Sequence, residues 1–182
     1  MVEIELRDAF FRRLLTPLRA RLVALERRSF LRLRSLAERR EAARATRRGQ
    51  SPTPDHLLTG ERGEDLAFFH LRSLGYTLVA RRWVSARVRG DLDLVAWDGD
   101  TLVVFEIKTR TARDLFPAAA EVDAAKQRQL RRLAAAYLAQ LPARHRANVP
   151  VRFDILSVYI VADHPEFEHT PNAFPYRAVS RS

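Results

Sequence analysis

A predicted helix over residues 119–141 separates two strand-like runs, residues 102–109 and 151–160. A helix in this position normally crosses from one end of a sheet to the other, and the two strands that it connects then lie parallel. A third run, residues 91–97, is joined to the first of them through Asp98-Gly99, a dipeptide typical of antiparallel hairpins. Parallel and antiparallel pairs within one stretch of chain predict an α/β fold, built on a mixed β-sheet flanked by helices.

The chain divides into four parts by composition. The main domain opens with a predicted helix over residues 61–74, with Thr59 as its N-cap and Gly75 as its stop, followed by a strand over residues 76–84. Before it, the segment GQSPTPDHLLTG carries two prolines and two glycines, which is typical of a linker. We therefore expect a basic amphipathic helical arm at residues 1–48, a linker at 49–58, the main domain at 59–162 and a loose C-terminal tail at 163–182.

Most of the positive charge lies in the N-terminal arm. The whole chain has 32 basic and 22 acidic residues, a net charge of +10, and its first 50 residues alone contain 14 arginines and 6 acidic residues. Apolar residues from Phe10 to Leu25 recur every three or four positions, as on one face of a helix, which Pro17 would kink. A basic arm of this kind can raise the affinity for nucleic acid. The alternatives are a solvated helix that packs its leucines on the main domain, and an upstream extension that reflects the choice of start codon.

Composition and motifs exclude several classes of protein. Without cysteine the chain cannot form disulfides, a thiolate zinc site, an iron-sulfur cluster or a cysteine nucleophile. Glycine-rich phosphate loops and nucleophile elbows are missing, and the five histidines share no ligand spacing. Charges interrupt every apolar stretch well before the roughly 20 residues of a membrane span, and the pattern of a signal peptide is lacking. We expect a soluble cytoplasmic protein with no membrane partner.

Carboxylates and a lysine gather on one face of the predicted hairpin. Side chains alternate along a strand, so Glu106 and Lys108 share a face, as do Asp91 and Asp93 on the preceding strand. A two-residue turn at Asp98-Gly99 would set Asp91 opposite Glu106, and a four-residue turn would set Asp93 opposite Glu106. Both registers bring the aspartates to the side of Glu106 and Lys108, whereas an odd loop would not.

Such a group of like charges favours a bound divalent cation. Acidic side chains that face each other across a sheet are unfavourable unless they are neutralised, and hard oxygen ligands suit Mg²⁺ or Mn²⁺. Glu64 on the first helix and Lys126 on the second lie on apolar stripes, so both should point toward the sheet. Structural explanations also exist: an exposed strand pattern for Glu106 and Lys108, a solvated sheet face for Asp91 and Asp93, a helix-dipole contact for Glu64 and a surface position for Lys126.

The motif set resembles that of a known family. In order, the chain carries Gly60-Glu61-Arg62-Gly63-Glu64, Arg89-Gly90-Asp91-Leu92-Asp93-Leu94, Val104-Phe105-Glu106-Ile107-Lys108-Thr109-Arg110, Lys126 and Arg152-Phe153-Asp154. Over about residues 59 to 160 this set resembles the YraN family of small bacterial proteins, which is similar to archaeal Holliday-junction resolvases and to the wider PD-(D/E)xK nuclease superfamily. The resemblance implies a restriction-endonuclease-like fold in which Asp93 and Glu106 bind Mg²⁺, Lys108 assists the attacking water and Glu64 adds a carboxylate from a helix. Asp91 departs from the glutamate that is commoner in the family, and we expect it to support the metal ligands from beside them.

These observations together predict a Mg²⁺- or Mn²⁺-dependent, structure-selective DNA endonuclease, acting on branched or single-stranded DNA in repair or recombination. Hydrolysis of a phosphodiester needs an activated water and neutralised phosphoryl charge, which a metal beside a lysine can supply. Substrate phosphates would be held by Lys126, Arg62, Arg89 and Arg110. A homodimer is compatible with this role, since two strands must be cut. The competing hypothesis is a non-catalytic nucleic-acid-binding or adaptor protein on a nuclease-like fold.

Overall fold

The computed structural model describes residues 19–40, 55–112, 122–142, 146, 148–161 and 164–176. In chain order its elements are an N-terminal helix over residues 19–40, α2 (Asp55–Leu74), β1 (Thr77–Val84), β2 (Asp91–Asp98), β3 (Thr101–Arg110), α3 (Ala124–Gln140), β4 (Val151–Val161) and β5 (His164–Phe174). Among these described helices, none is both long and apolar enough to cross a bilayer.

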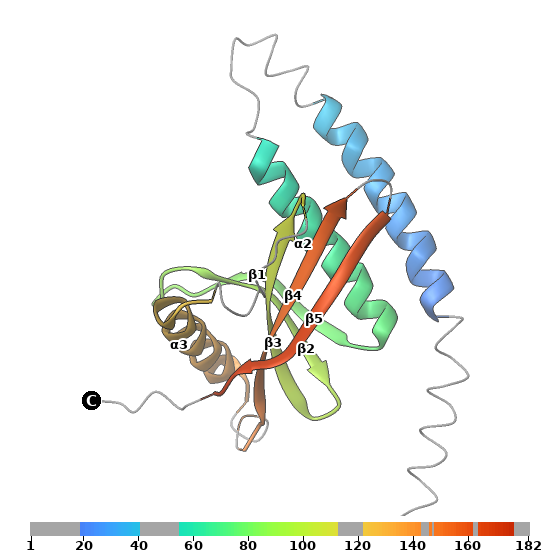
Figure 1. Ribbon diagram of the computed structural model, residues 1–182. Coiled ribbons are helices and arrows are strands. Elements are labelled where there is room, and N and C mark those ends of the chain that lie inside the picture. The colour runs from blue at the N-terminus through green and yellow to red at the C-terminus, as the bar shows by residue number, and fades with distance from the viewer. Residues whose placement is uncertain are drawn as a thin grey trace, which may run out of the picture.

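The five strands form one mixed sheet in the order β1-β2-β3-β4-β5 (Figure 1). Strands β3 and β4 pair in parallel, and the other neighbours pair antiparallel. The parallel pair is the one that α3 connects, because a chain must cross the length of the sheet before a second strand can run in the same direction. The predicted α/β class and mixed sheet are therefore confirmed.

Two boundaries differ from the predicted ones. Helix α2 begins at Asp55, within the segment predicted to be a linker, and residues 41–54 lie outside the described part of the chain. The segment predicted to be a loose tail instead forms β5, which pairs with β4 along the edge of the sheet. Pro165 and Pro171 interrupt the apolar pattern of β5, but an edge strand tolerates residues that lack an N–H on its open side. Alternating charged residues further concealed this strand in the sequence.

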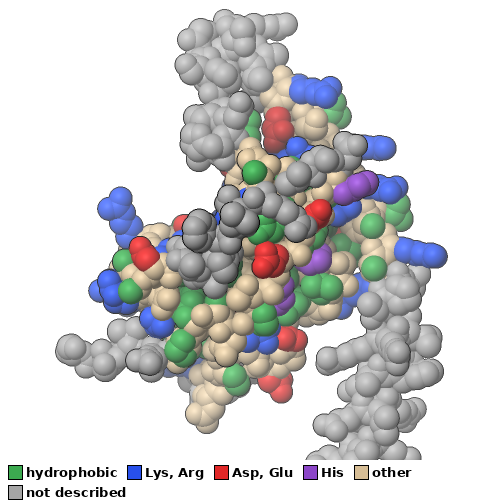
Figure 2. Space-filling view, in the orientation of Figure 1, with side chains coloured by type: hydrophobic (Ala, Val, Ile, Leu, Met, Phe, Trp, Pro, Cys, Tyr) green, Lys and Arg blue, Asp and Glu red, His purple; other side chains and the backbone are tan. Residues whose placement is uncertain are grey.

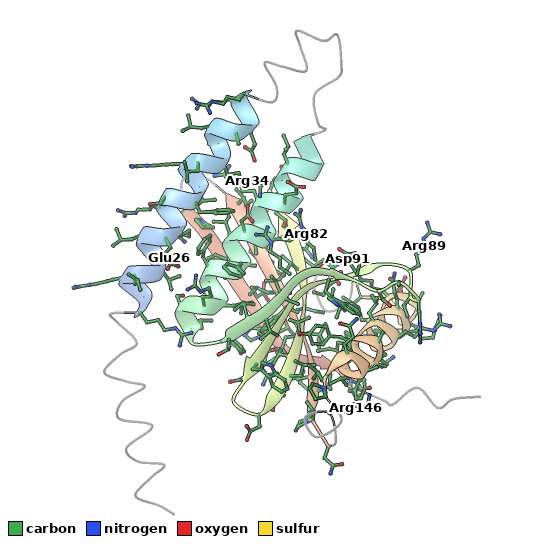
Figure 3. All side chains as sticks on the ribbon, turned by 180° about the vertical axis from the view of Figure 1, so that it is seen from behind. Glu26, Arg34, Arg82, Arg89, Asp91 and Arg146 are labelled. Carbon is green, nitrogen blue, oxygen red and sulfur yellow. The ribbon has the colours of Figure 1, made fainter. Side chains whose placement is uncertain are left out.

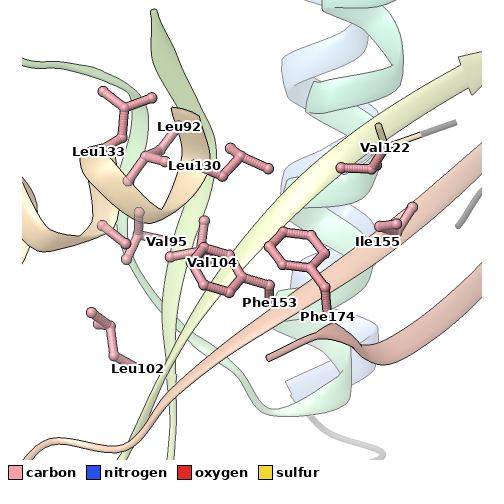
Figure 4. Packing of buried hydrophobic residues seen from close by; sticks show 11 residues of the cluster. Leu92, Val95, Leu102, Val104, Val122, Leu130, Leu133, Phe153, Ile155 and Phe174 are labelled. Atoms are coloured by element: carbon pink, nitrogen blue, oxygen red, sulfur yellow. The ribbon is translucent and has the colours of Figure 1, made fainter. Parts of the chain in front are cut away.

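One helix, α3 or α2, packs on each face of the sheet. On one face, α3 packs Leu130 and Leu133 against Leu92, Val104 and other residues of the central strands (Figure 4). On the opposite face, α2 packs its apolar stripe, which includes Leu66, Ala67 and Leu71, against side chains such as Phe105. Apolar side chains of β3 alternate between these two clusters, so β3 is buried from both sides. Polar side chains of β3 are therefore placed in an interior environment.

The N-terminal helix packs alongside α2, as Figures 1 and 3 show from opposite sides. Val23 is only 4% exposed, and the rings of Phe30 and Phe69 meet at 5.5 Å. Leu22 and Leu25, which we had expected on the packed face, are 60% and 61% exposed. Of the alternatives left open for the arm, packing on the main domain is the one that residues 19–40 show, but the buried side of the helix differs from the leucine face expected from the sequence. Phe10, Leu14, Pro17 and Leu18 lie outside the described residues.

Candidate active site

The hairpin register brings Asp93 next to Glu106. Strands β2 and β3 are joined by a two-residue turn, Gly99-Asp100, and pair from Asp98↔Thr101 to Leu94↔Phe105. This is the register in which Asp93 stands opposite Glu106. The prediction that both acids share one side of the sheet is confirmed, while the turn lies one residue later than Asp98-Gly99 because Asp98 is still part of β2.

Asp93 lies where the sheet is irregular. On the β1 side, the paired residues Arg81↔Leu94 and Trp83↔Leu92 flank Asp93 and Arg82, whose φ of 47° is in the left-handed region. On the β3 side, the paired residues of β2 and β3 end at Leu94↔Phe105. Beyond this pair, Oδ2 of the Asp93 side chain accepts a hydrogen bond of 2.7 Å from the backbone N–H of Ile107. This contact fixes the Asp93 carboxylate at the point where β2 and β3 separate.

Glu106 is buried and contacts two lysines. It is 5% exposed, with Lys108 Nζ 3.1 Å from Oε1 and Lys126 Nζ 3.0 Å from Oε2. Lys108 comes from the same face of β3, two residues further on, and Lys126 comes from the first turn of α3. Both predicted orientations are therefore confirmed, and the sheet face beneath α3 carries the charged cluster.

Burial and like charge shift the ionisation of this cluster. Burial is the main cause, and the neighbouring Glu106 carboxylate the second, of a rise in the pKa of Asp93 from 3.8 to about 7. For Lys126, burial is the largest single cause and would lower the pKa, but the charge and close contact of Glu106 together with the charges of Asp93 and Asp91 outweigh burial, and the pKa is raised. A buried carboxylate whose pKa rises this far lacks sufficient positive charge in its surroundings.

Glu64 approaches the same region from α2. The helix comes very close to β3 at Gly63, where an added Cβ would lie 1.8 Å from Thr109 Oγ1. Glu64, the next residue, has a side chain that is 19% exposed, and its Oε2 lies 2.5 Å from Arg82 Nε. Its negative charge also contributes to the raised pKa of Asp93, so Glu64 belongs to the same electrostatic neighbourhood.

The donor set is suited to a hard divalent cation. Glu106 Oε2 is fully buried, and within the described part of the chain no hydrogen-bond donor is well aligned with it. Mg²⁺ often binds proteins through only one or two carboxylates and keeps several waters, so Asp93 and Glu106 would suffice as ligands. Among the described residues, however, no three histidine or carboxylate side chains converge closely enough to hold a metal by themselves. A cation here would depend on water or substrate oxygens for its remaining ligands.

The other predicted residues occupy different positions. Asp91 is exposed at the start of β2, where its charge helps to raise the pKa of Lys126. Arg89 is exposed in the preceding loop beside α3 (Figure 3), and Gln129 of α3 holds this loop by donating to the Arg89 carbonyl at 2.9 Å. Arg62 is exposed on α2, but Arg110 is only 8% exposed. A phosphate could not reach Arg110 without rearrangement, so we omit it from the proposed phosphate contacts.

Sequence reasoning missed a second charged network, centred on Asp154. This carboxylate is 1% exposed and contacts Arg152 Nε at 2.8 Å, His169 Nε2 at 2.9 Å and the backbone N–H of Asn172 at 2.9 Å. Burial would raise the pKa of Asp154, but these partners outweigh it and the pKa is lowered. An acid in an apolar strand was a usable signal, yet His169 and Asn172 lay in the supposed tail. The network joins β4 to β5 at a bulge and is structural.

A second missed residue is Asp65, the neighbour of Glu64. Asp65 is fully buried and forms ion pairs with Arg34 of the N-terminal helix and with Arg81 of β1. It follows that α2 presents Glu64 toward the candidate site and Asp65 toward the N-terminal helix. The signal was an acid directly before the apolar residues of the buried stripe.

Fold and site together define an α/β protein whose mixed sheet, flanked by helices, is consistent with a nuclease-like fold. The chain belongs to the YraN family: the model described as Uncharacterised protein family UPF0102 matches residues 63–158. These residues run from the middle of α2 into β4 and include Glu64, Asp93, Glu106 and both lysines, whereas the N-terminal helix and β5 lie outside them.

Several curated relatives support this membership. A UPF0102 protein of Koribacter versatilis is 46% identical over 121 residues, which is 66% of this chain and 82% of that protein. A UPF0102 protein of Solibacter usitatus is 43% identical over 115 residues, covering 63% of this chain and 84% of that protein. One of Porphyromonas gingivalis is 41% identical over 123 residues, covering 66% and 87% respectively.

Proposed function

We propose that this protein is a Mg²⁺- or Mn²⁺-dependent endonuclease that hydrolyses phosphodiester bonds in branched or single-stranded DNA. The observation that carries the proposal is the convergence of two carboxylates, the partly buried Asp93 and the buried Glu106, with Lys108 at a break in the sheet. Perturbed ionisation, hard oxygen ligands and an adjacent ammonium group are the combination that metal-assisted phosphoryl hydrolysis requires.

Asp93 and Glu106 would hold the cation, and Glu64, whose carboxylate is paired with Arg82, would add negative potential from α2 instead of the third ligand that the sequence predicted. When bound, the cation would activate a water molecule and neutralise charge on the phosphoryl oxygens. Lys108 would orient that water and stabilise the charge that develops in the transition state. Asp91, exposed beside these ligands, would contribute negative potential without binding the cation.

Basic side chains around the site would bind the DNA backbone. Lys126 contacts Glu106, Arg89 lies in the loop that Gln129 of α3 holds, and Arg132 is exposed on α3 itself. Arg62 is exposed on α2, directly before Gly63, where the helix approaches β3. Contacts of this kind give affinity that depends on salt and not on base sequence, which suits a nuclease that selects DNA structure. The role would lie in cytoplasmic DNA repair or recombination, where a homodimer could cut two strands.

The test is cleavage by the purified protein of branched, nicked, single-stranded and duplex DNA with Mg²⁺ or Mn²⁺. Cleavage should disappear in Asp93→Asn and Glu106→Gln and fall at least 100-fold in Lys108→Met, as for loss of a transition-state contact. Asp100→Asn is a matched control, because Asp100 is exposed in the turn of the same hairpin. Retained cleavage in Glu106→Gln would refute the site, and inactivity of the parent on every substrate would refute the activity.

A non-catalytic nucleic-acid-binding or adaptor protein is the second candidate. The observation that favours it is a row of exposed arginines on the outer face of the N-terminal helix, namely Arg21, Arg28, Arg32 and Arg39. Figure 2 shows basic side chains projecting along this side of the molecule. If DNA binding and its salt dependence survive Asp93→Asn, and calorimetry detects no Mn²⁺ binding by the parent, this candidate replaces the nuclease.

A further inference from the structure

The only two lysines of the chain contact the same carboxylate. Of 32 basic residues, 30 are arginine, and the two exceptions, Lys108 and Lys126, each lie about 3 Å from one oxygen of Glu106. An arginine would present a planar fork that holds both carboxylate oxygens, whereas a lysine is a point charge on a flexible stem. In a chain that otherwise uses arginine, lysine at both positions gives Glu106 two partners that each contact one oxygen through a flexible stem.

The two lysines differ in how firmly they are held. Lys108 shares β3 with Glu106, so its backbone is fixed by ladders on the same strand. Lys126 reaches Glu106 from another element, and its backbone is anchored because its N–H donates to the capping carboxylate of Asp123 at 2.7 Å. The Lys126 side chain is 31% exposed, slightly more than the 25% of Lys108 and far more than the 6% of Glu106. Lys126 can therefore rotate toward solvent while α3 stays in place.

The contact itself is of the exchangeable kind. Lys126 Nζ lies 3.0 Å from Glu106 Oε2, yet among the described residues no donor is well aligned for a hydrogen bond to this oxygen. The pairing is an ion pair to one oxygen only, and a second cation at the same oxygen would oppose it. A phosphate group near the site would attract the ammonium group that has been released.

We propose that Lys126 is the exchangeable occupant of Glu106 Oε2: it neutralises Glu106 before metal binds, and moves to a backbone phosphate of bound DNA when a divalent cation takes its place. The inference rests on the proposed metal site. The exchange makes the binding of cation and DNA cooperative, because the cation displaces the Lys126 ammonium group from Glu106 and a DNA phosphate accepts it. Such coupling is reciprocal, so each ligand raises the affinity for the other. Loading of the metal would then be favoured on DNA and disfavoured in free protein.

The test measures Mn²⁺ affinity, from the electron paramagnetic resonance signal of free Mn²⁺, for the full-length parent and variants. Without DNA, Lys126→Met should bind Mn²⁺ about tenfold more tightly than the parent, since a repelling charge a few ångströms away is removed. Arg128→Met is the matched control, because it removes an exposed charge from the same helix, and its affinity should change less than twofold. Lys126→Arg, whose fork would keep both oxygens of Glu106, should bind Mn²⁺ several-fold more weakly than the parent.

A short DNA duplex supplies the second half of the test, with Mn²⁺ bound by the duplex alone measured and subtracted. The duplex should raise the Mn²⁺ affinity of the parent several-fold and that of Lys126→Met by less than twofold. If Lys126→Met binds Mn²⁺ no more tightly than the parent while Asp93→Asn abolishes binding, the metal site stands and the exchange is wrong. If the parent binds no Mn²⁺ with or without DNA, the proposed function fails and the exchange with it. Thermal unfolding of each variant establishes that the comparison is made between folded proteins.

Discussion

Replacing Arg34 with methionine is expected to lower the free energy of unfolding by about 2 kcal/mol, because it removes one of two partners of a buried carboxylate. Asp65 is fully buried and is paired with Arg34 and Arg81. Methionine keeps most of the aliphatic stem of Arg34, so the change tests the charge more than the packing. Since Arg34 belongs to the N-terminal helix and Asp65 to α2, the result measures how strongly this helix belongs to the fold.

The magnitude follows from the exposure of each contact. A hydrogen bond to a buried charged group contributes about 1.5–3 kcal/mol net. The other partners of Arg34, Glu38 and Glu61, have side chains that are 39% and 44% exposed, and such surface pairs contribute about 0–1 kcal/mol each. Asp65→Asn removes the charge between two guanidinium groups and should lower stability by about 3–5 kcal/mol.

Urea unfolding followed by circular dichroism measures these differences, and Glu38→Gln serves as the control, with an expected loss below about 0.5 kcal/mol. In the Asp65→Asn background, Arg34→Met should lower stability by at least about 1 kcal/mol less than in the parent, because its buried partner charge is already absent. A loss for Arg34→Met no greater than that of the control would mean that the buried pair does not hold the helix. The reasoning from burial to stability would then be refuted.

Three further predictions concern stability. Burial is the main cause of a pKa of His70 that is lowered to about 4, so the protein is most stable above pH 6.5, where His70 is neutral in both states, and loses stability as the pH falls toward 4. Unfolding curves at pH 7 and 4.5 measure this loss of stability, and His70→Phe should reduce it by about 1–2 kcal/mol, after allowance for the partial exposure of the ring. Gly63→Ala should lower the free energy of unfolding by about 1–3 kcal/mol, because the added methyl group collides with Thr109. Gly60→Ala in the same helix has open space around it and should raise the free energy of unfolding by about 0.5–1 kcal/mol. Equal unfolding midpoints for the two variants would contradict the close packing of α2. Asp154→Ala should lower stability by about 3–5 kcal/mol in the same assay, and a loss below about 1 kcal/mol would show that its cationic partners are solvated.

Much of the fold could be predicted because its signals are local. The crossover position of α3 and the hairpin dipeptide together dictated a mixed sheet, and the apolar runs located its central strands. Strand β5 escaped because an edge strand needs only one apolar side, and its alternating charges resemble those of an exposed tail. The start of α2 was misplaced because helix propensity continues into Asp55–Leu58, where prolines just before it had suggested a linker.

The parts of the candidate site that depend on side-chain alternation along strands, or on periodicity along helices, could be predicted from the sequence. The parity of the hairpin put Asp93 on the side of Glu106, and helical periodicity turned Glu64 and Lys126 toward the sheet. Contacts that depend on distant elements could not be found in this way. The partner of Asp65 comes from a helix about thirty residues earlier, and Arg110 is buried although its strand position suggested an exposed end.

The structure holds the carboxylates of the site more firmly than its lysines. Gly63 fixes the approach of α2 to β3, and the backbone of Ile107 holds the carboxylate of Asp93 in the break between strands. Glu106 is buried on the central strand β3, on the sheet face beneath α3. Both lysines reach Glu106 along partly exposed paths on stems with four rotatable bonds, and Lys126, 31% exposed against 25% for Lys108, does so from a separate element. A site with fixed carboxylates and a mobile ammonium group would keep its ligands in place for a metal while the positive charge that compensates them is exchanged.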